Sequence, residues 1–393
     1  MAIGKSHFFI LKGIKVMKAL ILSVTAGYGH HSTGMAMMEV FKAHGIECEM
    51  LDTLEYISRF LGESVQNGYL LLTKNLGEAY GKVFDSLAKK EEPSKSYSPE
   101  TIISKFLSKK LDSYMLDYNP DFVVGTHSYA TVLMTLLKER GVLNCPTFGV
   151  VTDFTLHPFW ESTRLDYYIL PDSLLNPAAE RKGIPENKIL PFGIPIKQKF
   201  LTKLDKSEAK NRLGLTNKPL LLVMMGSMGF GDITEVIRSC DSLKYDYQIT
   251  VICGSNEKAK DAINGELWQK DVRCLGFTDE VDVYMDAADV LITKPGGLTT
   301  SEAMAKGVPL ILMNPIPGQE ERNMEFLVNS GAAIMVTKGF SVEQALHQLF
   351  GNTWRRELME QAIRMLGKPD AANRLYEFIE EKVYNKSREG AMQ

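Results

Sequence analysis

Thr293 to Asn323 reads TKPGGLTTSEAMAKGVPLILMNPIPGQEERN and places two glycine-containing loops around one short helix. The DVLIT run just before it, Asp289 to Thr293, predicts a buried strand, and the proline and two glycines that follow predict a turn. We expect a helix from Thr299 to Lys306, because Gly307 is a typical helix stop. A second strand is predicted from Val308 to Met313. This order of strand, loop, helix and strand is the repeating unit of a parallel α/β sheet.

The same stretch has the features of a phosphate-binding loop. Gly296 and Gly297 let a ligand approach the backbone, and the free N–H groups at a helix start favour phosphate oxygens. Glu302 lies one turn into the helix, where its carboxylate can accept from ribose hydroxyls. A structural alternative remains open, in which Thr299 and Glu302 form a Thr-x-x-Glu capping box and the glycines only make the turn.

Composition limits the kind of protein. With 393 residues, of which 45% are hydrophobic, the chain has material for two domains of roughly 100 to 200 residues each. Forty-five basic and 48 acidic side chains give a net charge of -3, which excludes nucleic-acid binding driven by an overall positive field. The five cysteines form no Cys-x-x-Cys pair and are expected to be reduced, as in a cytosolic protein.

The N-terminal run FFILKGIKV is far shorter than the roughly 18 apolar residues of a membrane span, so residues 1–16 are given no fold role. From residue 18 onward, strand-like runs alternate with helix-like runs in two series, separated at Ile194-Pro195-Ile196. We predict an α/β fold of two doubly wound Rossmann-like domains facing an interdomain cleft. The boundaries are 1–196 for an acceptor-binding domain, 197–365 for a UDP-sugar-binding domain, and 366–393 for a helix packing back towards the first domain.

The first glycine loop, Gly27 to Ser32 (GYGHHS), resembles a dinucleotide fingerprint, except that Ser32 occupies the place of its third glycine. A dehydrogenase would use Asp52, at the end of the second strand, for the cofactor ribose, and this alternative is left open. His30 is the candidate catalytic base, because an imidazole at this loop can accept a proton from an attacking hydroxyl at neutral pH. The structural alternative is that it hydrogen-bonds the loop backbone.

Further residues of the second domain suit the same ligand. Gly226 and Ser227 offer a second phosphate-binding loop, Gly276 and Phe277 a surface for a planar base, and Gln319 and Glu320 polar groups for sugar hydroxyls. The chain contains no Asp-x-Asp and no His/Cys/Asp cluster with metal spacing, so no metal or other cofactor is predicted. Helix dipoles and backbone donors would stabilise a departing diphosphate instead.

Residues 56–116 are the least strand-like part of the chain and are rich in aromatic residues and lysine. Apolar positions from Ile102 to Met115 recur at helical spacing with three lysines among them, which is typical of a helix lying on an anionic membrane surface. A surface helix packed on the protein core has the same pattern, and both interpretations remain open.

These residues resemble those of the glycolipid-forming glycosyltransferases that include plant monogalactosyldiacylglycerol synthase and bacterial processive diacylglycerol glucosyltransferase. The resemblance covers about residues 17 to 385 and is carried by Gly27 to His30, Thr126-His127, Thr152-Asp153-Phe154 with His157 and Trp160, Gly193 to Ile196, and Lys294 to Asn323. More distantly, the chain is similar to the GlcNAc transferase of peptidoglycan lipid synthesis. Tyr28 departs from the family, which usually has glycine there.

The resemblance implies a GT-B fold and inverting, metal-independent transfer of glucose or galactose from a UDP-sugar to diacylglycerol. The reaction would take place on the cytoplasmic side of the cell membrane, with the enzyme bound peripherally to anionic lipids and to no nucleic acid. It implies His30 as base, Glu302 as ribose ligand, and Gln319 and Glu320 as sugar contacts. Gly29, Asp153 and His157 would lie on the acceptor side. Three alternatives remain: a UDP-GlcNAc transferase to a polyprenyl lipid, a UDP-sugar epimerase or hydrolase with a soluble ligand, and a non-catalytic nucleotide-sugar sensor.

Overall fold

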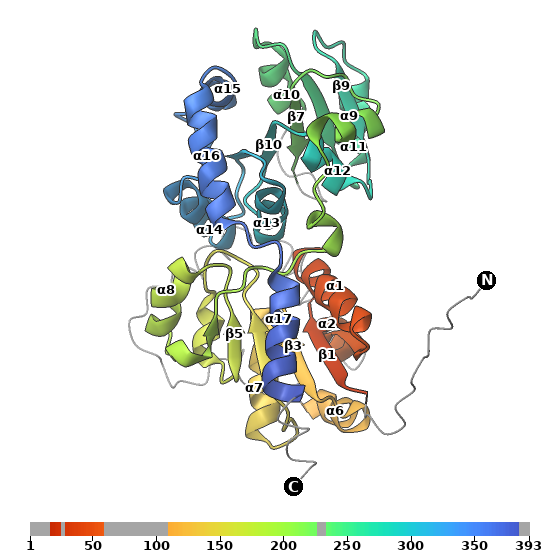
Figure 1. The fold of residues 1–393 in the computed structure, drawn as a ribbon, viewed down its shortest axis with the longest axis vertical. Coiled ribbons are helices and arrows are strands. Elements are labelled where there is room, and N and C mark those ends of the chain that lie inside the picture. The colour runs from red at the N-terminus through yellow and green to blue at the C-terminus, as the bar shows by residue number, and fades with distance from the viewer. Residues whose placement is uncertain (1–15, 25–27, 59–108, 226–232, 385–393) are drawn as a thin grey trace, which may run out of the picture.

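The computed structural model describes residues 16–24, 28–58, 109–225 and 233–384. They form two α/β domains, one above the other in Figure 1, and the chain passes from the first to the second between residues 190 and 206. Each domain contains a six-stranded sheet in which every strand pair is parallel. Two doubly wound sheets of this kind confirm the predicted fold class.

The N-terminal sheet has the order β2-β1-β3-β4-β5-β6. Its strands are β1 (Lys18–Ser23), β2 (Glu47–Asp52), β3 (Phe122–Gly125), β4 (Thr147–Val150), β5 (Tyr167–Ile169) and β6 (Ile189–Leu190). Its helices are α1 (Tyr28–Ala43), α2 (Thr53–Ser58), α6 (Asp112–Tyr118), α7 (Ser128–Glu139) and α8 (Asn176–Arg181), with short 3-10 turns η1 (Lys109–Leu111), η2 (Pro158–Ser162), η3 (Ser173–Leu175) and η4 (Glu186–Lys188).

The C-terminal sheet has the order β12-β11-β10-β7-β8-β9. Its strands are β7 (Leu220–Met224), β8 (Gln248–Ile252), β9 (Val272–Leu275), β10 (Val290–Thr293), β11 (Leu310–Leu312) and β12 (Ala333–Met335). The helices are α9 (Lys206–Arg212), α10 (Ile233–Asp241), α11 (Glu257–Asn264), α12 (Val281–Ala287), α13 (Gly297–Lys306), α14 (Gln319–Asn329), α15 (Val342–Phe350) and α16 (Thr353–Leu366), with η5 (Gln198–Phe200) at the domain junction.

The last helix, α17 (Ala371–Ile379), leaves the C-terminal domain, is followed by a π turn, η6 (Glu380–Tyr384), and lies beside α1 on the N-terminal sheet (Figure 1). Its Leu375 and Ile379 are fully buried in the hydrophobic cluster that also contains Phe122 and Phe148 of β3 and β4. The last described helix therefore packs on the domain that contains β1.

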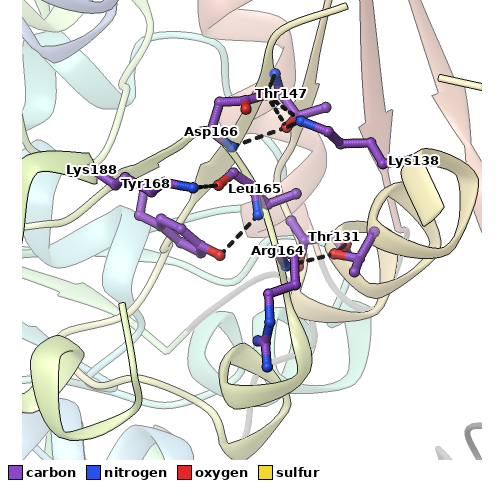
Figure 2. A network of polar contacts seen from close by, with 9 residues as sticks. Thr131, Lys138, Thr147, Arg164, Leu165, Asp166, Tyr168 and Lys188 are labelled. Carbon is purple, nitrogen blue, oxygen red and sulfur yellow. Dashed lines mark hydrogen bonds and ion pairs between the residues drawn. The ribbon is translucent and has the colours of Figure 1, made fainter. Parts of the chain in front are cut away.

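Asp166 lies just before β5 and connects the amino ends of β4 and β5 through hydrogen bonds (Figure 2). Its Oδ2 accepts from the Thr147 backbone N–H at 2.9 Å, from the Thr147 hydroxyl at 2.8 Å and from the Lys138 ammonium at 2.5 Å. Burial raises the pKa of Asp166, but these hydrogen bonds outweigh it and hold the pKa below its ordinary value. The network is structural and sets how α7 packs against the two strands.

Two helix starts differ from the prediction. The first glycine loop was expected to extend to Ser32, but α1 begins at Tyr28, so Gly29 and His30 lie in the first turn of a helix. The helix after β10 was expected from Thr299 but begins at Gly297, with Gly296 as its cap and no side-chain capping bond, so the Thr-x-x-Glu capping box is wrong. In both cases packing extends a helix through glycine, whose intrinsic helix propensity is low.

The short strands β6 and β12 were not predicted, because two or three residues are too few to show a period. Most of the predicted helix from Ile102 to Met115 lies outside the described residues. Its end is described, and there Leu111 and Met115 are buried in the core of the N-terminal domain. For these two residues the core-facing interpretation holds.

Candidate functional site

The site lies where the loop after β4 meets the first turns of α13 and α14. Gly297 packs so closely on this loop that a Cβ atom there would lie 2.1 Å from the Thr152 carbonyl oxygen. Parallel sheets bind ligands at the carboxyl ends of their strands, and here the carboxyl ends of β4 and β10 come together across the domain boundary. Residues predicted separately from the two halves of the sequence are thus brought into one region.

His30 is oriented by two oxygens of the N-terminal domain. Its Nδ1 lies 2.8 Å from the Thr126 carbonyl oxygen and 2.9 Å from the Thr152 hydroxyl. Because a carbonyl oxygen only accepts, Nδ1 carries the proton and donates it. The neutral ring then has its lone pair on Nε2, which is the protonation state that a general base requires.

Two more histidines lie nearby: His127 caps the start of α7 and His157 caps the start of η2. The His127 ring is 4.5 Å from the His30 ring in an edge contact, and its Nδ1 accepts from the Tyr129 N–H at 3.0 Å. Burial, with the nearby His30 and His157, lowers the pKa of His127 well below its ordinary value. His157 Nδ1 accepts from the Phe159 N–H, and burial with the charge of Lys182 lowers its pKa to about 4. Both rings are therefore neutral at physiological pH, and His127 was not predicted as a site residue.

Asp153 joins the two domains. Its Oδ1 accepts from the Asn323 amide at 2.7 Å, and its Oδ2 accepts from the Gln319 amide. Asn323 is fully buried and also accepts from the Phe154 N–H at 2.7 Å and donates to the Pro295 carbonyl at 3.0 Å. The Asn323 amide thus makes hydrogen bonds to both domains, although no role was predicted for this residue by itself.

The start of α13 carries backbone N–H groups that have no partner within the helix. The first backbone bond of the helix runs from the Thr300 N–H to the Gly296 carbonyl, so the N–H groups of Gly297, Leu298 and Thr299 precede the helical ladder. No side chain caps this end. These donors and the helix dipole are the features from which the sequence predicts phosphate binding, and that binding stays a prediction.

Glu302, one turn further along α13, has an unusual environment. Burial raises the pKa of its carboxyl to about 8, although Lys197 and Lys199 act in the opposite direction. Within the described ranges no hydrogen bond reaches this carboxyl. At neutral pH it is therefore largely protonated and has both a donor and an acceptor to offer a ligand.

Glu320 is occupied within its own domain. One carboxylate oxygen accepts from Lys294 at 2.7 Å and the other from the Ile316 N–H at 2.9 Å. These bonds hold the loop between β11 and α14 against the end of β10. A sugar hydroxyl bound by Glu320 would have to donate to the same two carboxylate oxygens that Lys294 and Ile316 already use.

The remaining predicted donor residues lie further away or outside the described part. Gly276 and Phe277 follow β9, the edge strand, which the sheet order places three strands, or roughly 14 Å, from β10. The Phe277 side chain is 81% exposed, so its ring is open to a ligand. Gly226 and Ser227 lie outside the described residues.

No group of three or more His, Cys, Asp and Glu side chains in the described ranges is arranged to hold a metal ion. The part of the chain that the structure describes contains no helix long and apolar enough to cross a membrane.

Comparison with known proteins agrees with this geometry. The family described as monogalactosyldiacylglycerol (MGDG) synthase matches residues 30–196, and the glycosyltransferase family 28 C-terminal domain matches residues 220–375. The processive diacylglycerol beta-glucosyltransferase of Bacillus pumilus is 28% identical over 370 residues, which are 93% of this chain and 95% of that protein.

Two solved structures share the fold over most of their length. The crystal structure of Acinetobacter baumannii MurG has a TM-score of 0.58 at 16% identity and covers 93% of this chain and 100% of its own. A UDP-GlcNAc 2-epimerase from Neisseria meningitidis, bound to UDP-GlcNAc, has a TM-score of 0.59 at 13% identity, with 93% and 100% covered. The two sheets form a GT-B fold, and the chain consists of an MGDG-synthase domain followed by a glycosyltransferase family 28 C-terminal domain.

Proposed function

We propose that this protein is an inverting glycosyltransferase that moves glucose or galactose from a UDP-sugar to the free hydroxyl of diacylglycerol. The product would be a β-glycolipid, made on the cytoplasmic face of the cell membrane by a peripherally bound enzyme. The observation that carries the proposal is His30, whose Nε2 is left as an acceptor beside the domain boundary where α13 begins. The names of the relatives support diacylglycerol as acceptor.

In the proposed reaction, His30 Nε2 takes the proton of the acceptor hydroxyl while its oxygen forms a bond to the anomeric carbon of the hexose. The bond from that carbon to the diphosphate oxygen breaks, and its electron pair leaves with UDP. Attack from the face opposite to the leaving group inverts the configuration. Because His127 and His157 are both neutral, the imidazolium formed at His30 would carry the positive charge of this group of three histidines.

The leaving diphosphate would be stabilised by the N–H groups at the start of α13 instead of a metal ion. Glu302 would hydrogen-bond the ribose, Phe277 would lie against the uracil, and Gln319 and Glu320 would contact the hexose. Asp153 would line the acceptor side together with Gly29 and His157. Because Asp153 also holds Gln319 and Asn323, binding of either substrate would be coupled to the position of the two domains.

The test offers the purified protein radiolabelled UDP-glucose or UDP-galactose with diacylglycerol in mixed micelles. Labelled lipid is expected from one donor, and mass and linkage analysis identifies the product. Lack of labelled lipid with both donors would refute the proposal. Conversion of the UDP-sugar without lipid would favour an epimerase or hydrolase.

A His30→Ala variant is expected to lose on the order of 10² to 10⁴ in turnover while its affinity for UDP is retained, because a base acts in the chemical step. Lys42→Ala is the control on the same helix. Lys42 is exposed in the last turn of α1, roughly 18 Å along its axis from His30, and should leave turnover unchanged. Equal losses in both variants would show that the effect comes from the helix and not from a base.

A further inference from the structure

Helix α16 has two apolar faces, one packed in the protein core and the other exposed. Met359, Ile363 and Leu366 point into the core of the C-terminal domain and are 0%, 0% and 8% exposed. Trp354, Leu358 and Met365 are 61%, 52% and 78% exposed. Their spacing of four and seven residues places these three side chains along one line of the helix, which we call the α16 stripe.

The stripe is a concentration of apolar side chains and not a random scatter. Nine large hydrophobic side chains are exposed in the described part of the chain, and three of them form the stripe. Single exposed apolar residues are normal, whereas a contiguous group on one element marks an interaction surface. In Figure 1, α16 runs along the outer side of the C-terminal domain from α15 to the domain boundary.

The charge around the stripe is positive, although the whole chain is net negative. Residues 353–368 carry four basic side chains, Arg355, Arg356, Arg364 and Lys368, against the acidic Glu357 and Glu360. The ion pairs of these cations are long: Arg364 lies 4.0 Å and Arg356 3.7 Å from Glu360, and Lys368 lies 3.7 Å from Asp172 of the N-terminal domain. Such partly exposed pairs are weak, so the cations can also serve a partner.

We propose that the α16 stripe docks this enzyme on the surface of a bilayer containing anionic lipid. A tryptophan and two unbranched or γ-branched apolar side chains flanked by arginines are the composition of an interfacial membrane helix. A second copy of the chain fits less well, because three side chains present far less than the roughly 800 Å² per partner of a stable protein interface. The inference rests on the proposed lipid acceptor, which requires the enzyme to meet a bilayer.

The position of the stripe suits that role. Helix α16 packs on α13, whose first turn forms the proposed donor site, and Lys368 just beyond α16 reaches Asp172 across the domain boundary. Leu174, two residues after Asp172, is a further exposed apolar side chain at 62%. Docking here would bring the bilayer next to the boundary through which a lipid acceptor enters.

Trp354 makes the contact directly measurable. Trp160 is 3% exposed and Trp268 is half-buried, so Trp354 is the exposed indole of the three in the chain. The full-length protein is mixed with vesicles of equal parts phosphatidylglycerol and phosphatidylcholine carrying brominated acyl chains. Quenching of tryptophan fluorescence is expected with these vesicles, and Trp354→Phe should abolish it while vesicle cosedimentation continues.

A Trp354→Gln/Leu358→Gln/Met365→Gln variant should bind the vesicles at least roughly tenfold less tightly, because its apolar anchor is lost. Leu267→Gln, a change of the same kind at a fully exposed leucine elsewhere in the domain, is the control and should bind as the parent does. Unchanged cosedimentation of the triple variant, or vesicle binding without quenching of Trp354, would overturn the proposal. A vesicle-free dimer that depends on the stripe would overturn it as well.

Activity separates this inference from the proposed function. The triple variant should transfer hexose to diacylglycerol in detergent micelles at the parent rate and lose transfer on vesicles. A protein that binds vesicles through the stripe but makes no glycolipid would refute the function and leave the docking surface intact.

Discussion

Glu302 has a carboxyl that is neutral in the folded protein over most of the physiological range. Burial raises its pKa from 4.5 to about 8, which means that the folded state binds a proton that the unfolded chain has released. The stabilising contribution of the protonated form is therefore complete below about pH 4.5 and is lost as the pH rises through about 8. The same carboxyl therefore contributes to the pH dependence of folding stability and offers a hydrogen-bond donor and acceptor to a ligand.

A Glu302→Gln variant is predicted to gain stability relative to the parent as the pH rises. Glutamine does not ionise, so the difference in melting temperature, variant minus parent, should grow by a few degrees between about pH 4.5 and pH 8. Thermal unfolding followed by circular dichroism across this range measures the difference. Glu325→Gln on α14 controls for replacing a glutamate at an exposed position. A difference that is independent of pH would contradict the prediction.

The sequence allowed some site residues to be predicted and not others, for a physical reason. Glu302 and Gln319 follow glycine-containing turns, and such local patterns are visible in one stretch of chain. Asn323 could not be recognised, because its partner Asp153 is 170 positions away and only the folded domains bring them together. The tautomer of His30 likewise depends on the Thr126 carbonyl. Every residue has such a backbone group, so the sequence does not reveal it as a partner.

The start of α13 shows that tertiary packing can override a local sequence pattern. Thr299 and Glu302 have the spacing of a capping box, yet the helix begins two residues earlier, at Gly297. A glycine there removes the Cβ that would meet the Thr152 carbonyl, so the helix can approach the loop after β4. The strands with five or six residues were predictable from their apolar runs, whereas this contact across the domain boundary was not.

Gly297→Ala is therefore predicted to disturb the domain boundary. The added methyl would lie 2.1 Å from a backbone oxygen, so either α13 or the loop after β4 must move. The hydrogen bonds of Asp153 to α14 should weaken, and transfer activity should fall on the order of 10²-fold, since a displacement of about 1 Å is enough to misalign reacting groups. Turnover in the micelle assay, together with the melting temperature, measures both effects.

Gly339→Ala is the control for this substitution, because a Cβ at Gly339 has no atom within 4 Å. It should keep the activity and melting temperature of the parent. Full activity of Gly297→Ala would mean that the close contact of α13 with Thr152 is not needed for function.

From Leu366 onward, the described part of the chain packs first against the core of the C-terminal domain and then against that of the N-terminal domain. Leu366, the last residue of α16, belongs to the core of the C-terminal domain, whereas Leu375 of α17 is fully buried against the N-terminal sheet. His44, just after α1, stacks on Tyr376 with ring centroids 3.8 Å apart, and the ring of Phe378 lies 4.8 Å from that of Tyr167 of β5. The C-terminal helix therefore stabilises the domain that contains His30.

Substitutions on the two sides of Gly367, the residue that ends α16, are predicted to destabilise different domains. Leu375→Ala should cost roughly 2–5 kcal/mol through the cavity left in the N-terminal core, and Leu366→Ala a similar or smaller amount in the C-terminal core. Hydrogen exchange of the native protein distinguishes them, because each variant should raise exchange in the strands of its own sheet: β1, β3 and β4 for Leu375→Ala, and the C-terminal strands for Leu366→Ala. If Leu375→Ala instead accelerated exchange in the C-terminal sheet and left β1 protected, α17 would belong to the domain it has left, and the N-terminal core would be complete without it.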